Sequence, residues 1–255
     1  MILLKEGDNM ETPYYYLTLI GFIATFIGTL GGGGGLINLP SMLLLGVPIH
    51  TAIASNKFSN SFSSFTSFYS IWKKKQVNLK LGLSIVPFTI TGGITGALLA
   101  SFLTEEILLK VALALLVIAT ILNIVKSKIK RNDNNDTPSP LFYPTYLGIG
   151  AFDGLFGPGQ ATLLMHSFLT AGHSFLTSIG LTRLQTFASC FVSFIVYFSM
   201  GYFDWKVGVA LGLGSFLGAQ TAIKLANRLA FLPWQKILST FSIFLIVYLF
   251  FKIIY

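Results

Sequence analysis

The feature that most constrains this chain is the length of sequence that carries almost no charge. Lys57 is the only formally charged residue in residues 14–72, and none occurs in residues 81–103. Residues 141–203 contain two, Asp153 and Arg183. A membrane-spanning helix needs about 20 mostly apolar residues, so each block has room for one or more spans.

The composition points the same way. Hydrophobic residues make up 53% of the 255 residues and charged residues 10%, against about a quarter charged in soluble proteins. So few charges cannot cover the surface of a water-soluble globule, and the single cysteine, Cys190, excludes a disulfide scaffold. The net charge is +8, but the basic residues lie between apolar blocks, which favours topology signals over nucleic-acid binding. We therefore predict an integral membrane protein whose surroundings are the lipid bilayer.

Glycine, proline and turn dipeptides divide the apolar blocks into ten predicted segments. These are residues 14–30, 33–47, 50–72, 81–103, 106–126, 142–157, 159–172, 174–200, 206–228 and 233–254. The segments at 33–47 and 159–172 are short for a crossing and follow glycine-rich loops, which is typical of half-helices buried in protein. The predicted fold class is an all-α polytopic membrane protein with eight to ten hydrophobic segments, four to five in each half.

An internal repeat supports the division into halves. A shift of 126 residues aligns residues 28–126 with residues 154–252 without a gap. The aligned identities include rare glycines and lysines: Gly31 with Gly157, Gly33 with Gly159, Gly82 with Gly208, Gly92 with Gly218, Lys80 with Lys206 and Lys110 with Lys236. A duplicated membrane half is a common transporter architecture.

The repeat predicts four regions. Residues 1–13 form an N-terminal tail, 14–126 the first transmembrane repeat, 127–141 a linker and 142–255 the second repeat. The tail lacks the basic region and small-residue cleavage site of a signal peptide.

The basic loops predict the orientation of the segments. Residues 73–80 and 126–131 are rich in lysine and should be cytoplasmic, whereas Glu105 and Glu106 mark an outside loop. In the second half the charges of the corresponding loops are exchanged. The counterpart of the lysine-rich loop, residues 200–205, carries only Asp204. Five segments in each half make the repeats inverted and keep the basic loops inside. Four crossings in each half make them parallel and leave Arg228 and Lys236 outside, so inversion is favoured.

The two glycine loops are candidate anion-binding elements. Gly33, Gly34 and Gly35 belong to a run of five glycines, followed closely by Asn38. Consecutive glycines break a helix, and the freed N–H groups at the start of the next helix suit an anion. The second copy retains Gly159, and Gln160 adds an amide donor. The alternative is close helix packing, although packing motifs space their glycines one turn apart.

Lys57 and Arg183 lie 126 residues apart, at equivalent places in the repeat, and follow Asn56 and Thr182. A cation at the centre of a membrane costs about 2.5–3.5 kcal/mol on insertion scales, so both should face the interior or a watery cavity. The alternative is that each snorkels to a nearby interface. Because the first half holds no buried acid, we expect a substrate anion to be the counter-ion, with Asn56 and Thr182 beside it.

Asp153 is the one acid deep in an apolar block. Either it pairs with Arg183, or it titrates and couples transport to protons. His166 is a second candidate for proton coupling, with packing as its simpler role. Three scattered histidines and one cysteine give no metal-ligand spacing, so no metal, no cofactor and no catalytic residue is predicted.

These motifs resemble the TauE/SafE (sulfite exporter) family of membrane proteins. The resemblance rests on the glycine run with Leu36-Ile37-Asn38-Leu39-Pro40, on Ala54-Ser55-Asn56-Lys57, on Gly92-Gly93 with Gly96, and on their second copies at 154–159 and 182–183. It departs from the family at the second loop, which has fewer glycines, and at His166, which stands where the first half has Pro40.

The resemblance implies a multi-pass permease of the bacterial cytoplasmic (inner) membrane. Its substrates would be sulfite, sulfonates or related sulfur-containing or organic anions, held by Lys57, Arg183 and the two glycine loops. An anion channel, an intramembrane enzyme, or an assembly factor that uses its glycines only for packing remain alternatives. A proton and Na⁺ are both open as coupling ions, as is assembly into a homo-oligomer, and no nucleic acid is expected.

Overall fold

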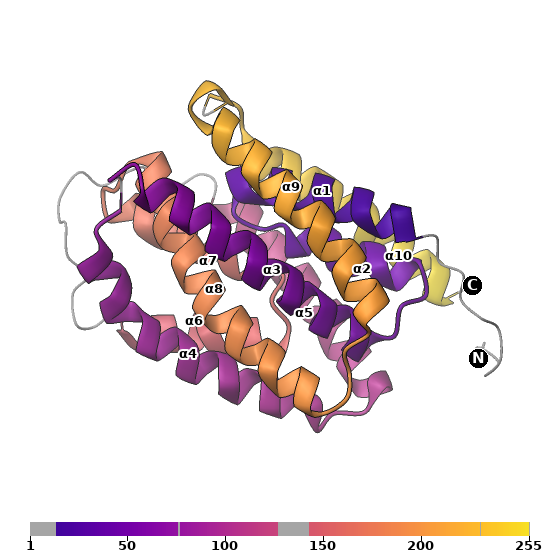
Figure 1. Ribbon diagram of the computed structural model, residues 1–255. Coiled ribbons are helices and arrows are strands. Elements are labelled where there is room, and N and C mark those ends of the chain that lie inside the picture. Colours follow the sequence, from indigo (N-terminus) through magenta and orange to yellow (C-terminus); the bar gives the residue numbers. More distant parts are fainter. Residues whose placement is uncertain (1–13, 76, 127–142, 230, 255) are drawn as a thin grey trace.

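The computed structural model describes residues 14–75, 77–126, 143–229 and 231–254, and it forms ten α-helices there (Figure 1). In chain order they are α1 (Tyr14–Gly31), α2 (Gly35–Leu44), α3 (Ile49–Trp72), α4 (Leu79–Ser101), α5 (Glu105–Lys126), α6 (Tyr143–Leu155), α7 (Gln160–Thr170), α8 (Phe175–Ser199), α9 (Trp205–Leu229) and α10 (Trp234–Ile254). No strand occurs in these ranges. The prediction of an all-α protein with ten segments is confirmed, and each helix ends within a few residues of its predicted limits.

The two short helices are too short to cross a bilayer. α2 has 10 residues and α7 has 11. At 1.5 Å per residue, such helices extend only about 15–17 Å, roughly half of a 30 Å hydrocarbon core. Both therefore begin inside the protein, where other helices cover them.

α3 and α8 pack against each other in opposite directions at the centre of the molecule. The ring centroids of Phe58 and Phe194 lie 5.2 Å apart, and those of Phe65 and Phe187 lie 5.1 Å apart. Residues later in α3 thus meet residues earlier in α8. Because these helices occupy the same place in the two halves, their antiparallel course shows that the halves are inverted, as favoured from the basic loops.

The first helix of each half packs against the fourth helix of the other. α1 lies along α9, and α6 lies along α4. α3 also contacts α9, while α8 contacts α4. The two halves are therefore interlocked, and residues 126 positions apart approach the centre from opposite sides.

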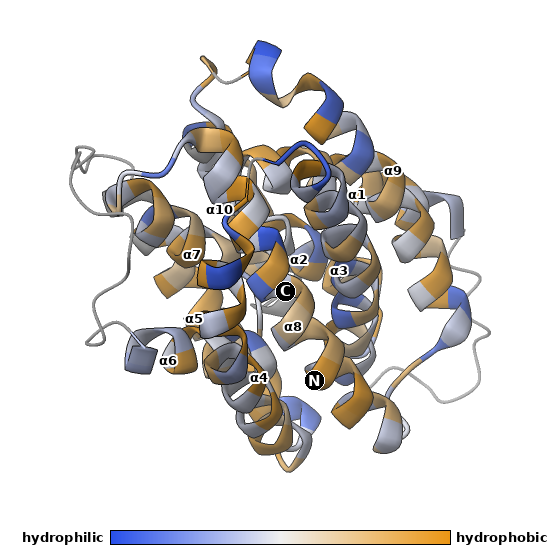
Figure 2. Ribbon diagram, turned by 60° about the vertical axis from the view of Figure 1, so that its left-hand side comes forward, coloured by the Kyte–Doolittle hydropathy of each residue, from blue (hydrophilic) through white to orange (hydrophobic). Residues whose placement is uncertain are grey.

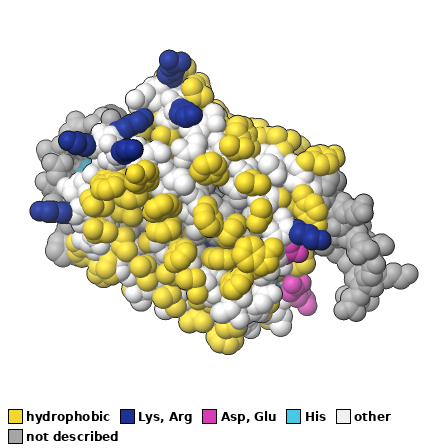
Figure 3. All heavy atoms as spheres, in the orientation of Figure 1, with side chains coloured by type: hydrophobic (Ala, Val, Ile, Leu, Met, Phe, Trp, Pro, Cys, Tyr) yellow, Lys and Arg dark blue, Asp and Glu magenta, His cyan; other side chains and the backbone are white. Residues whose placement is uncertain are grey.

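The outer surface is strongly apolar. Figure 2 shows hydrophobic residues along most of the helices, and Figure 3 shows hydrophobic side chains over much of one face. Among the described residues, four helices are long and apolar enough to cross a membrane, namely α1, α4, α8 and α9. α3 is 24 residues long but richer in serine, because its polar side chains point into the protein.

Charged side chains gather at the ends of the helices. In Figure 3, most Lys and Arg side chains lie over the α3–α4 turn and the C-terminal end of α9, whereas the Asp and Glu side chains lie toward the opposite end, beside a further basic side chain. Lys73, Lys74, Lys75, Lys224 and Arg228 are all exposed. This separation agrees with basic loops on one membrane side. The predicted tail at 1–13 and linker at 127–141 lie outside the described residues, and the boundaries of the repeats stay a prediction.

Candidate functional site

The first glycine loop turns the chain sharply between α1 and α2. Gly32 has a φ of +84°, a left-handed conformation that suits glycine. The loop then folds back onto α1 so closely that a methyl group at Gly28 would overlap the main-chain N and Cα of Gly34. The second loop ends α6 in the same way, with positive φ at Gly157 and Gly159.

Both loops leave helix N-termini without partners inside the protein. No side chain caps α2 or α7. The N–H groups of Gly34 and Gly35 donate to no acceptor in the described part of the chain, and the same holds for Ala161 in the first turn of α7. Free N–H groups and the positive ends of two helix dipoles favour a negative charge at this place.

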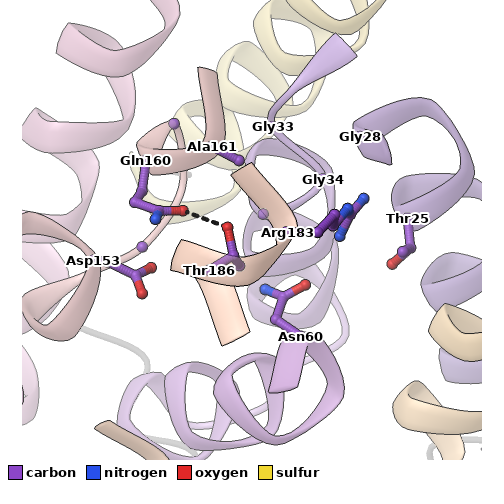
Figure 4. A pocket seen from close by; sticks show the side chains of 13 residues that line it. Thr25, Gly28, Gly33, Gly34, Asn60, Asp153, Gln160, Ala161, Arg183 and Thr186 are labelled. Carbon is purple, nitrogen blue, oxygen red and sulfur yellow. Dashed lines mark hydrogen bonds between the residues drawn. The ribbon is translucent and has the colours of Figure 1, made fainter. Parts of the chain in front are cut away.

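The two N-termini meet at a small cavity in the centre of the molecule (Figure 4). Its volume is about 20 Å³, close to the smallest space that holds one water molecule. It is lined by residues of α1, α2, α3, α6, α7 and α8 and by both loops: Thr25, Gly28, Gly33, Gly34, Gly35, Asn60, Asp153, Gly157, Gly159, Gln160, Ala161, Arg183 and Thr186. In this conformation the cavity has room for about one water molecule.

Arg183 supplies a positive charge to this cavity. Its side chain is buried and extends toward Gly28, Gly34 and Thr25 (Figure 4). Nη2 donates a hydrogen bond to Thr29 Oγ1, and Nη1 donates to Ser64 Oγ at 3.3 Å. Guanidinium has five N–H donors, and within the described residues no carboxylate forms an ion pair with it. Arg183 is therefore a buried cation that only neutral groups contact.

Gln160 adds a neutral donor on the opposite side of the cavity. Its Oε1 accepts a hydrogen bond from Thr186 Oγ1 at 3.2 Å, the contact drawn in Figure 4. Its Nε2 is buried and has no partner among the described groups, as is also true of Thr25 Oγ1. Buried polar atoms are nearly always hydrogen-bonded, so these unpartnered atoms make the cavity a candidate binding site.

Lys57 has a different environment. It is fully buried, and its Nζ donates to Asp153 Oδ1 at 2.7 Å and to the main-chain oxygen of the same residue. The other carboxylate oxygen of Asp153 accepts from Ser189 Oγ at 2.5 Å and Cys190 Sγ at 3.3 Å. The expectation that a substrate anion neutralises both cations is therefore wrong for Lys57. The alternative pairing of Asp153 with Arg183 is wrong as well.

The remaining predicted site residues do not line the cavity. Asn38 Nδ2 donates to Asn56 Oδ1 at 3.3 Å, which links α2 to α3 behind the first loop. Thr182 is buried with an unpartnered hydroxyl. His166 lies half-buried on α7.

The structure adds lining residues that sequence reasoning missed, chiefly Thr25, Asn60 and Thr186. Thr186 lies 126 residues after Asn60, so the repeat contained a signal for this pair. Thr25 carried no signal, because it is one threonine in an apolar helix that packing happens to turn inward. Within the described residues no group of three metal-binding side chains occurs.

Residues 17–249 match the family model described as sulfite exporter TauE/SafE. A "probable membrane transporter protein ORF9" from Sinorhizobium sp is 35% identical over 215 residues, which cover 83% of this chain and 82% of that protein. A "probable membrane transporter protein" of Haemophilus influenzae is 28% identical over 82% and 83% of the two chains. The protein YfcA of Escherichia coli K12, also named a probable membrane transporter, is 24% identical over 87% and 82%. No solved structure matches the chain.

Proposed function

Because the chain belongs to the sulfite exporter TauE/SafE family of membrane transporters, we propose that it is a secondary transporter (permease) for small anions. Sulfite, sulfonates and related sulfur-containing or organic anions are the proposed substrates. The proposed location is the bacterial cytoplasmic membrane, which the protein crosses several times.

The observation that carries this proposal is the buried guanidinium of Arg183. A buried cation without a carboxylate partner is costly, and an anionic substrate would remove that cost on binding. The same cavity presents two uncapped helix N-termini and the unpartnered Nε2 of Gln160. These groups are all donors or positive dipole ends, so their chemistry suits the oxygens of an oxyanion or sulfonate.

Substrate access would require the two inverted halves to move relative to each other. A cavity of about 20 Å³ has no room for an anion of several heavy atoms, so the site would open toward one side and then the other. Lys57 does not line the cavity itself, but its hydrogen bond holds Asp153, which does. Asp153 is the proposed proton-coupling group, whereas His166 lies outside the cavity lining.

Uptake into proteoliposomes tests the proposal. We expect labelled sulfite or a small sulfonate to accumulate when a proton or Na⁺ gradient is imposed, and Arg183→Gln to abolish the accumulation. Arg228→Gln is the matched control, because Arg228 is an exposed cation at the end of α9. Equal uptake by the wild type and Arg183→Gln would contradict the proposed site.

The same assay separates the rival functions. A channel would equilibrate the anion without concentrating it, whatever gradient is applied. An intramembrane enzyme would return a chemically altered anion, and an assembly factor would show no ligand response in either variant.

A further inference from the structure

We propose that the cavity selects anions that carry one negative charge over those that carry two. This inference rests on the proposed function and specifies its substrate class. It follows from a count of the charges that the tertiary structure buries.

Three formally charged side chains are buried in the described part of the chain: Lys57, Asp153 and Arg183. Lys57 and Asp153 neutralise each other through a direct contact of 2.7 Å. Every other Lys and Arg whose side chain is described is exposed at a helix end. The buried site therefore has a net charge of one positive unit, located at Arg183.

One singly charged anion completes this site. Its charge offsets Arg183, and its oxygens accept from the guanidinium, from Gln160 Nε2 and from the free N–H groups of Gly34 and Gly35. A neutral molecule of the same shape would leave the guanidinium without a counter-ion. Burying either charge unpaired is costly in a low-dielectric interior.

A doubly charged anion leaves one negative charge without a cation. The neighbouring carboxylate of Asp153 lines the same cavity and would repel that second charge. Lys57 cannot offset it without giving up its contact with Asp153, which would leave that carboxylate buried and unpaired. The selectivity thus depends on the buried site keeping a net charge of one positive unit.

Two isosteric ligands test the inference on the purified wild-type protein in lipid nanodiscs. Sulfoacetamide carries one negative charge, whereas sulfoacetate replaces the amide with a carboxylate and carries two. Methylsulfonylacetamide is the neutral control. At neutral pH and constant ionic strength, we expect calorimetric titration to give sulfoacetamide an affinity about tenfold or more above that of sulfoacetate, with no binding of the neutral compound.

Two variants locate the effect. Arg183→Gln should lose binding of both anions. The double variant Lys57→Met with Asp153→Asn keeps the net charge of the site, so it should still bind sulfoacetamide more tightly than sulfoacetate, and equal binding of the two would contradict the charge count.

The outcomes are distinguishable. Sulfoacetate binding as tightly as sulfoacetamide to the wild type would overturn the inference and leave an anion transporter in place. If neither these ligands nor sulfite or methanesulfonate bind or move across liposomes, the proposed function fails, and the inference fails with it.

Discussion

Lys57 on α3 and Arg183 on α8 lie 126 residues apart, and each reaches from its own half to the first helix of the other half. Lys57 contacts Asp153 on α6, and Arg183 contacts Thr29 on α1. The place in α1 that corresponds to Asp153 is Ile27, which carries no charge. A single acid in one half thus makes one cation part of an internal ion pair and leaves the other without a carboxylate partner among the described residues. Sequence-equivalent residues in duplicated halves need not share a role.

The largest predicted difference between Lys57 and Arg183 is in their contribution to the free energy of unfolding. We expect Lys57→Ala to lower the free energy of unfolding by about 3–5 kcal/mol, because it leaves Asp153 buried and unpaired. Arg183→Ala should cost clearly less, since it strands only hydroxyl groups. Thermal unfolding in one detergent compares the two variants. Equal destabilisation would contradict the distinction between a paired and an unpaired cation.

A second variant would give Arg183 the counter-ion that Lys57 already has. Thr29→Asp places a carboxylate at the side chain that Arg183 Nη2 contacts, so we expect the affinity for a small sulfonate to fall about tenfold or more. Thr29→Asn, similar in size but neutral, is the control and should bind much more tightly than Thr29→Asp. Calorimetric titration of methanesulfonate measures both. Unaltered binding by Thr29→Asp would indicate that the charge of Arg183 is not what the ligand meets.

The glycine loop that faces Arg183 gives a third prediction. Gly28→Ala would push the added methyl group into Gly34, and overpacking of this kind costs about 1–3 kcal/mol. We also expect weaker anion binding, because the N-terminus of α2 would shift. Gly148→Ala on α6 is the control, since nothing lies within 4 Å of its added methyl group. Thermal unfolding measured with and without ligand reports both the stability and the anion binding. If Gly28→Ala changed neither, the loop would be loosely packed.

The smallest predicted effect concerns the orientation of Gln160. Thr186→Val removes the hydroxyl that donates to Gln160 Oε1, a hydrogen bond worth about 1 kcal/mol. We expect anion affinity to fall a few-fold with little loss of stability, while Thr186→Ser retains it. Titration of the three proteins decides this point. If Thr186→Val lowered the anion affinity more than Thr29→Asp does, Gln160 rather than Arg183 would be the main anion-binding group.

Much of the fold could be predicted because lipid imposes a simple rule on the chain. Spans need long apolar runs and glycine loops interrupt them, so the ten helices follow from hydropathy and turn residues. Gly33, Gly159, Gln160 and Arg183 could be placed at the candidate site, because each occupies a position whose equivalent in the other half is also a candidate. The partner of Lys57 could not, because Asp153 lies 96 residues further along the chain and the sequence does not show which helices meet.

The amino-acid sequence alone determined the membrane environment, the number of helices and the two buried cations, since these depend on composition and local order. Tertiary packing decided which cation is neutralised. An ion pair requires side chains on two different helices to meet, and the sequence does not show which helices are neighbours or how they are aligned. It also decided that the N-termini of α2 and α7 open into one cavity beside Arg183. A buried charge is balanced by whatever lies within a few ångströms of it, and only the folded arrangement of the helices sets those distances.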